Sequence, residues 1–170
     1  GDELITFLDS DDKLADDAME KAAQYFDAHE DVFVAAIGIR YFDAYEGEQR
    51  LNWRFEKTDV VDIKKDYTYP HYYVGGVFLR HAVLDELHFD ESLSFWEDAL
   101  AVNQVIVSQG KYGLIAGTHY YYRKREDESS LVDTAWHKKE RYTTLLSSGY
   151  GQLFAYSRKK HHRIIPYVQY

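Results

Sequence analysis

Two carboxylates separated by one residue are the first feature of this sequence that could do chemistry. Asp9 and Asp11 follow the apolar run at residues 4–8, which is typical of a short β-strand. Carboxylates placed in this way can share Mg²⁺ or Mn²⁺, which prefers oxygen ligands and keeps coordination positions open for phosphate. Helix capping would explain the same aspartates. We expect Asp11 to be the more direct metal ligand and Asp12 to cap a following helix.

A second acidic pair lies at the start of an expected helix. Glu97 and Asp98 open the helical pattern of residues 95–109, and Gly110 is placed to end it. A carboxylate at a helix start is accessible and held in place, as a general base must be. Favourable interaction with the helix dipole is the alternative explanation for both acids.

Basic and hydroxyl side chains are concentrated in residues 120–131. Arg123 and Arg125 could pair with phosphate, since guanidinium binds phosphate through two parallel hydrogen bonds, and Ser129 and Ser130 could add hydroxyl donors. A solvated, charged loop would have the same composition. His119 precedes this segment, and a histidine beside a tyrosine-rich strand is more often packed than bound to a ligand.

The three segments together resemble family 2 glycosyltransferases of the GT-A type. Residues 1–12 are similar to the family signature that ends in Phe-Leu-Asp-Ser-Asp-Asp, and residues 88–98 are similar to the acceptor-side motif that ends in Glu-Asp. Residues 120–131 resemble a stretch in wall- and capsule-polysaccharide members. The resemblance implies sugar transfer with inversion, a nucleotide-sugar donor, a glycan or polyol-phosphate acceptor, and Mn²⁺ or Mg²⁺ as the cofactor.

The resemblance also implies a role for each candidate residue. Asp98 would be the general base, with Glu97 beside it to orient the acceptor, while Asp9 and Asp11, with His119, would bind the metal. Arg123, Arg125, Ser129 and Ser130 would close over the donor diphosphate. The acceptor cleft would include His71, Tyr72, Arg80 and Trp96, close to the glycine pair Gly75 and Gly76.

Composition and charge narrow the classes of partner. Residues 1–120 contain 10 Lys+Arg and 24 Asp+Glu, a balance of −14, whereas residues 121–170 contain 10 and 5, a balance of +5. The acidic body argues against nucleic acid. The basic segment could meet phosphate, an anionic membrane surface or an acidic neighbouring domain. The sequence has no cysteine and no run of about 18 apolar residues, so we expect a cytoplasmic protein. The likeness to wall-polysaccharide members implies that it works at the inner face of the cell membrane.

The expected fold is α/β, the C-terminal portion of a GT-A mixed-sheet domain with flanking helices. Hydrophobic patterning predicts strands at residues 4–8, 32–39, 51–55, 60–63 and 112–123, and helices at residues 14–26, 95–109 and 135–160, the last one interrupted at Gly149 and Gly151. We expect a catalytic half at residues 1–131 and a helical segment at residues 132–170.

Two alternatives remain open at this stage. The family begins with a nucleotide-binding half that this chain lacks, so the chain could be a fragment or a non-catalytic glycosyltransferase-like binding module. A phosphatase of the haloacid-dehalogenase type also places Asp-x-Asp after a strand, but it has Thr or Val where this sequence has Lys13.

Overall fold

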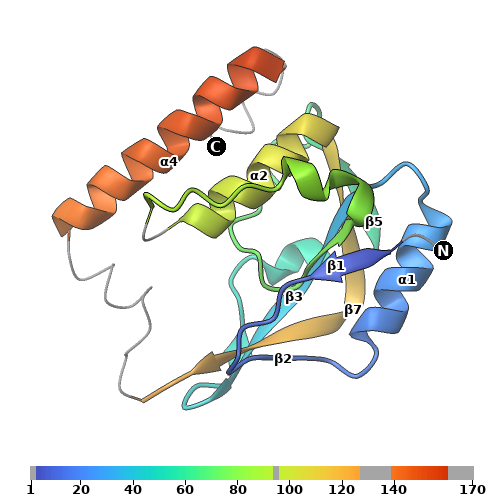
Figure 1. Cartoon of the computed structure of the whole chain (residues 1–170). Coiled ribbons are helices and arrows are strands. Elements are labelled where there is room, and N and C mark those ends of the chain that lie inside the picture. Colours follow the sequence, from blue (N-terminus) through green and yellow to red (C-terminus); the bar gives the residue numbers. More distant parts are fainter. Residues whose placement is uncertain (1–2, 94–95, 127–138, 161–170) are drawn as a thin grey trace. The chain divides into compact units, whose positions relative to one another are not determined.

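The structure, a computed structural model, describes residues 3–93, 96–126 and 139–160 (Figure 1). The strands are β1 (Leu4–Thr6), β2 (Lys13–Leu14), β3 (Val34–Asp43), β4 (Gly47–Glu48), β5 (Asp59–Asp62), β6 (Val77–Arg80) and β7 (Lys111–Lys124). The α-helices are α1 (Ala18–Ala28), α2 (Glu97–Gln109) and α4 (Lys139–Lys160), and the 3-10 helices are η1 (Asn52–Phe55) and η2 (His81–Glu86).

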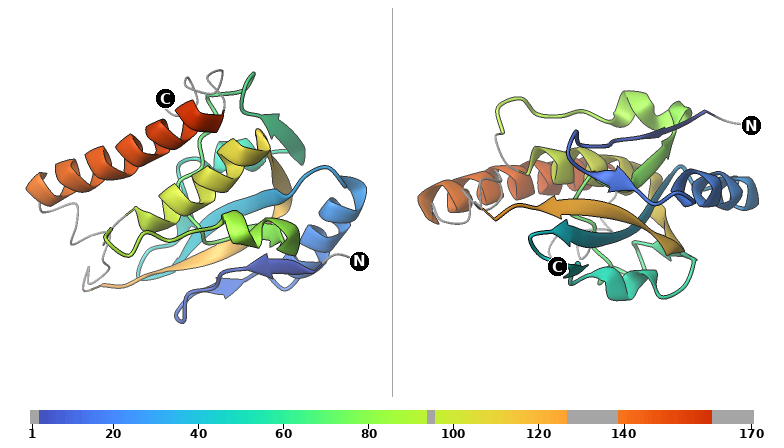
Figure 2. Two further views of the ribbon diagram at one scale, coloured as in Figure 1. Left: turned by 45° about the horizontal axis from the view of Figure 1, so that its top comes forward. Right: turned by 90° about the horizontal axis from the view of Figure 1, so that it is seen from below.

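The strands form a mixed sheet with the order β1-β6-β3-β7-β2, to which β4 adds beside β3 and β5 beside β7. The central pair, β3 and β7, is parallel and lies side by side in Figure 2, whereas β1 with β6, β6 with β3, and β2 with β7 are antiparallel. The register of the central pair shifts between Ile37 and Gly38, where β7 moves from Ile115 to His119. Gly117, with φ of 74°, permits this irregularity.

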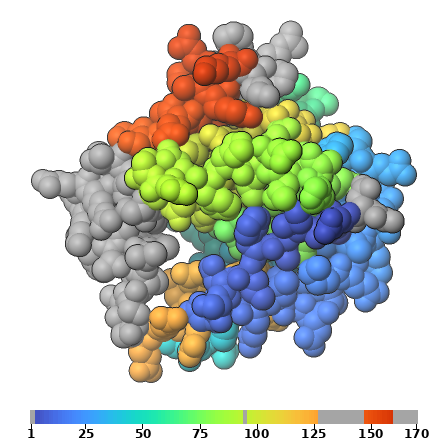
Figure 3. Space-filling view, in the orientation of Figure 1, coloured from blue at the N-terminus to red at the C-terminus, as the bar shows by residue number. Residues whose placement is uncertain are grey.

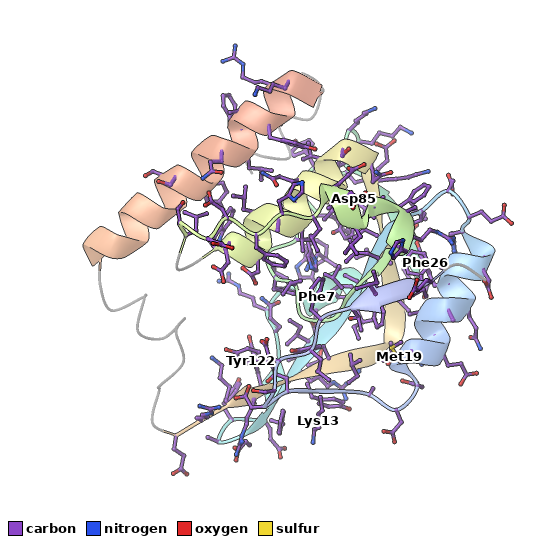
Figure 4. The ribbon with its side chains drawn as sticks, viewed as in Figure 1. Phe7, Lys13, Met19, Phe26, Asp85 and Tyr122 are labelled. Carbon is purple, nitrogen blue, oxygen red and sulfur yellow. The ribbon has the colours of Figure 1, made fainter. Side chains whose placement is uncertain are left out.

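The core of the sheet follows from the apolar patterning. Six consecutive residues of β3, from Val34 to Ile39, are buried, as expected for a central strand covered on both faces. Helix α1 buries Ala18, Ala22, Tyr25 and Phe26, which share one helical face. Phe26 is labelled in Figure 4, and Met19, also labelled, is half exposed. The predicted buried strand at residues 32–39 and the amphipathic helix that precedes it are therefore confirmed.

Three predictions about local structure are wrong. The strand predicted at residues 51–55 is replaced by η1 (Asn52–Phe55). The Asn52 side chain bonds to both backbone groups of Ile39, accepting at 3.0 Å and donating at 2.8 Å. Helix α1 begins at Ala18 instead of residue 14, because Lys13 and Leu14 pair with β7. Helix α4 continues through Gly149 and Gly151, although the part of the prediction before residue 139 lies outside the described residues.

The chain divides into two units, each described here by itself. The first comprises Gly1–Val61, Val74–Leu84 and Lys111–Lys124, and the second comprises Asp62–Tyr73, Asp85–Gly110 and Arg125–Tyr170. The sheet and α1 belong to the first unit, and α2 packs against α4 in the second. The boundary predicted between residues 131 and 132 falls in a stretch that the structure does not describe.

Candidate functional site

The first group of candidate residues lies in the acidic loop, residues 9–12, which connects β1 to β2. These two strands are the two ends of the strand order, so the connection passes from one side of the sheet to the other. Phe7 and Lys13, which flank the connection, are labelled in Figure 4. Leu8 is 51% exposed, and Figure 3 shows the N-terminal residues, in dark blue, at the surface. The acidic loop is thus accessible from solvent.

Asp12 anchors this loop to β7. Its two carboxylate oxygens accept hydrogen bonds from the Tyr120 hydroxyl, at 2.7 Å, and from the backbone N–H of Arg123, at 2.8 Å. Burial raises the pKa of Asp12 above its usual value. The prediction that Asp12 caps a helix is wrong, because the following helix begins six residues later and Asp17 occupies its N-cap position.

Asp9 and Asp11 have the chemistry of a cation site. The Asp9 side chain is exposed and Asp11 is half-buried. Among the residues that the structure describes, no group of three or more His, Cys, Asp or Glu side chains is arranged to hold a metal. Mg²⁺ and its analogues need only one or two carboxylates when substrate phosphates complete the coordination. The pair therefore fits a cation that is bound together with a diphosphate, and a closed structural metal site is not expected here.

Arg123 lies beside the acidic loop. Its Nε donates to Asp43 at 2.6 Å, and Asp43, followed by Asp11, raises the pKa of the guanidinium above its usual value. The structure therefore brings Arg123 and Asp11 into one region, while their roles toward phosphate and metal stay predictions. Arg125 is exposed just after β7, and the predicted donor contacts Ser129 and Ser130 lie outside the described residues.

The geometry does not support His119 as a ligand beside Asp9 and Asp11. Adjacent side chains of a strand point to opposite faces, and the neighbour of His119, Tyr120, is the one that reaches the acidic loop. Burial, followed by the charge of Arg40, lowers the pKa of His119, and the other charges that act on this histidine come from Glu48, Asp17 and Lys21.

The second group of candidate residues lies at the start of α2, in the second unit. Asp98 is half-buried, and its Oδ1 accepts a hydrogen bond from the Ala99 backbone N–H at 2.7 Å. Glu97 Oε2 is buried and has no hydrogen-bond partner among the described residues. A buried carboxylate oxygen without a partner costs stability unless a water, an ion or a ligand satisfies it.

An aromatic cluster surrounds this helix start. The Trp96 ring centroid lies 6.2 Å from that of Tyr72 and 4.2 Å from that of Tyr150 on α4. Trp96 has φ of 73°, which is rare for a bulky residue and marks local strain immediately before Glu97. The predicted acceptor residues Tyr72 and Trp96 are thus brought together, and Tyr150 joins them from a helix that pattern reasoning did not connect to the site.

The other two predicted acceptor residues, His71 and Arg80, are buried and contact backbone carbonyl groups. His71 is 1% exposed, and its Nε2 lies 2.7 Å from the Tyr73 carbonyl oxygen. Arg80 is 7% exposed, and its guanidinium donates to the carbonyls of Val32 (3.0 Å), Phe26 (2.7 Å) and His29 (3.3 Å). Buried side chains that are engaged in this way do not fit the predicted contact with an acceptor.

We expect Arg80→Met to lower the free energy of unfolding by about 2–4 kcal/mol, because the buried carbonyls of Phe26 and Val32 each lose a charged donor. Chemical unfolding followed by circular dichroism would measure this loss. Arg40→Met is the matched control. Arg40 is exposed and pairs with Glu48 at 2.8 Å, a contact typically worth less than about 1 kcal/mol. Equal losses in the two variants would contradict the structural role of Arg80.

Sequence reasoning missed two residues that organise the first group. They are Tyr120 and Asp43, neither of which is among the site residues predicted from the sequence. The alternation of β7 could have indicated that Tyr120 and Tyr122 share one face. No local signal indicates that Asp43, with φ of 81°, pairs with a residue 80 positions away.

Among the described residues, none of the helices is both long enough and apolar enough to cross a membrane.

Comparison with known proteins gives consistent matches. The chain is 41% identical over 169 residues to the minor teichoic acid biosynthesis protein GgaA of Bacillus subtilis (strain 168), covering 98% of this chain and 38% of that protein. It is 32% identical over 170 residues to the minor teichoic acid biosynthesis protein GgaB of the same organism, covering 98% of this chain and 19% of that protein. The chain thus spans well under half the length of these curated relatives.

A solved structure supports the fold. The crystal structure of S. aureus TarS 1-349 matches with a TM-score of 0.63 and 17% sequence identity, covering 98% of this chain and 46% of that one. The predicted mixed α/β fold of the GT-A type is confirmed by this likeness. The model of the family described as glycosyl transferase family 2 matches residues 1–88, which include the acidic loop. The chain therefore belongs to glycosyltransferase family 2.

Proposed function

We propose that this chain supplies the metal-binding and acceptor-side parts of an inverting glycosyltransferase. The enzyme would transfer a sugar from a nucleotide-sugar donor to a glycan or polyol-phosphate acceptor in bacterial surface-polymer synthesis. The observation that carries the proposal is the acidic loop. There Asp9 and Asp11 are accessible to solvent while Asp12 is committed to β7. The names of the curated relatives, which refer to minor teichoic acid biosynthesis, support the polymer class.

On the donor side, Asp9 and Asp11 would hold Mn²⁺ or Mg²⁺. The cation, when bound, offsets negative charge on the leaving diphosphate. Arg123 would exchange its exposed pairing with Asp43 for a bidentate contact with phosphate. The exchange is energetically accessible, because an exposed ion pair of this kind is worth only about 0–1 kcal/mol.

On the acceptor side, Asp98 would accept the proton of the attacking hydroxyl. Its Oδ1 accepts a hydrogen bond from the Ala99 N–H at the start of α2, which holds the carboxylate in place as a general base requires. Tyr72 and Trp96 present aromatic faces of the kind that suit sugar rings. Glu97, with its buried oxygen, would orient the acceptor hydroxyl.

In this scheme the enzyme works at the cytoplasmic face of the membrane, where the basic segment at residues 121–170 would favour anionic surfaces.

We expect the natural full-length protein to release nucleoside diphosphate from one member of a nucleotide-sugar panel, dependent on added Mn²⁺ and an acceptor. Coupled detection of the diphosphate would measure turnover, and NMR of the product would show inversion at the anomeric carbon. Chelation should abolish turnover. Acceptor binding without turnover for any donor would instead support a non-catalytic glycosyltransferase-like module.

A further inference from the structure

Tyr120 connects the central part of β7 to the acidic loop. Its side chain is 1% exposed, yet its hydroxyl reaches two loop residues. The hydroxyl donates to Asp12 Oδ2 at 2.7 Å and accepts from the Asp9 backbone N–H at 3.3 Å. One hydroxyl can make both bonds at once, since it carries one donor proton and two acceptor lone pairs.

These contacts fix both ends of the loop and leave its middle accessible. A turn closes the loop, since the Asp12 N–H donates to the Asp9 carbonyl at 3.1 Å. The Arg123 N–H holds the second oxygen of Asp12. Asp11 lies between these anchors. Asp9 carries the other carboxylate, and its backbone N–H is bonded to Tyr120. The separation of the Asp9 and Asp11 carboxylates therefore depends on a tyrosine that is about 110 residues away in the chain.

The glycine pair before β6 provides the space for the Tyr120 ring. A Cβ atom at Gly75 would lie 3.0 Å from Tyr120 Cζ, and one at Gly76 would lie 3.0 Å from Tyr120 Cβ and 2.9 Å from Ile37 Cγ1. Gly76 also has φ of 73°, which disfavours other residues. A side chain at either position would displace the ring and, with it, the hydroxyl.

We propose that Tyr120 is a positioning residue, which holds the acidic loop in the shape that binds the cation, and that Gly75 and Gly76 form the slot for its ring. This inference rests on the proposed function, in which Asp9 and Asp11 bind Mn²⁺. It adds a role for a buried tyrosine and for two glycines that the resemblance had suggested only as part of an acceptor cleft. Tyr120 acts through the loop backbone and through Asp12, and not by touching the cation.

The test is the affinity of the natural full-length protein for Mn²⁺ alone, measured by calorimetry. Tyr120→Phe should weaken Mn²⁺ binding by about ten- to a hundred-fold, since a hydrogen bond to a charged group is lost. Tyr112→Phe is the matched control. Tyr112 is also on β7 and 0% exposed, and its hydroxyl accepts from Arg54 at 3.3 Å. Both variants should lower the thermal midpoint, but Tyr112→Phe should bind Mn²⁺ normally.

A second variant separates positioning from loss of folding. Gly75→Ala keeps the hydroxyl but crowds the ring, so it should also weaken Mn²⁺ binding, and it should add little when combined with Tyr120→Phe. Additive effects, or normal Mn²⁺ affinity in Tyr120→Phe while Asp11→Asn loses it, would overturn the positioning role and leave the proposed function standing. Normal Mn²⁺ affinity in both Tyr120→Phe and Asp11→Asn would contradict the proposed metal site and, with it, the positioning role of Tyr120.

Discussion

Asp98→Asn is expected to reduce turnover by about 10²–10⁴-fold, the usual effect of losing a general base. Asparagine has nearly the same shape, and its carbonyl oxygen can still accept the Ala99 N–H, so the start of α2 should keep its structure. The amide cannot take up a proton from the acceptor hydroxyl. Mn²⁺ affinity should be unchanged, because the proposed metal ligands, Asp9 and Asp11, lie in the acidic loop and not in α2. Steady-state turnover and Mn²⁺ calorimetry on the natural full-length protein would test both expectations.

Asp90→Asn is the control for this substitution. Asp90 lies in the same sequence block, but its oxygens accept from Ser92 and from Gln152 at 2.7 Å, which are contacts within the second unit. Asp90→Asn should leave turnover nearly unchanged. Normal turnover in Asp98→Asn would refute its assignment as the base. A large loss in Glu97→Gln alone would transfer that role to Glu97.

Much of the fold can be predicted from the sequence because local patterning and tertiary structure agree there. The apolar run of β3 has no polar interruption between Val34 and Ile39, so a buried central strand is its simplest interpretation. Gly110 ends α2 as predicted, in the left-handed conformation with φ of 74° and with its N–H on the Ile106 carbonyl.

Prediction fails where a distant residue decides the local conformation. Residues 51–55 have the composition of a strand, yet Asn52 turns the chain into η1 by bonding to the backbone of Ile39. Lys13 and Leu14 would extend α1, but pairing with Tyr121 and Tyr120 makes them a strand. In both cases the partner is absent from the local window, and tertiary contacts override propensity.

The candidate site divides in the same way. Short sequence motifs are sufficient to name the candidate carboxylates Asp9, Asp11, Glu97 and Asp98. The burial of His71 and Arg80 could not be predicted from the local sequence, because it depends on which residues pack around them in the fold. An arginine beside a predicted cleft has the same local sequence whether it binds an acceptor or, as here, donates to the carbonyls of α1 and Val32.

Asp11→Asn is expected to weaken Mn²⁺ binding by at least about a hundred-fold. Outer contacts that only orient metal ligands are worth about 10–100-fold in affinity, and Asp11 is proposed to be a direct ligand. The substitution removes one of the two carboxylates that are proposed to hold the cation, and with it one negative charge. Asp12 cannot substitute readily, since both of its oxygens are engaged by Tyr120 and Arg123.

The charge of the region alone could attract Mn²⁺, so the control must remove an equal charge nearby. Asp16→Asn does so at an exposed position between β2 and α1, and it should leave Mn²⁺ affinity nearly unchanged. Raising the salt concentration should weaken any nonspecific attraction in all variants alike.

Equal Mn²⁺ affinity in the unmodified protein and Asp11→Asn would show that Asp11 is not a ligand. Equal losses in Asp11→Asn and Asp16→Asn would reduce the effect to general electrostatics. If Asp9 and Asp11 bind the cation and donor phosphates complete its coordination, only Asp11→Asn should lose Mn²⁺ affinity. Its turnover at a fixed Mn²⁺ concentration should fall in parallel.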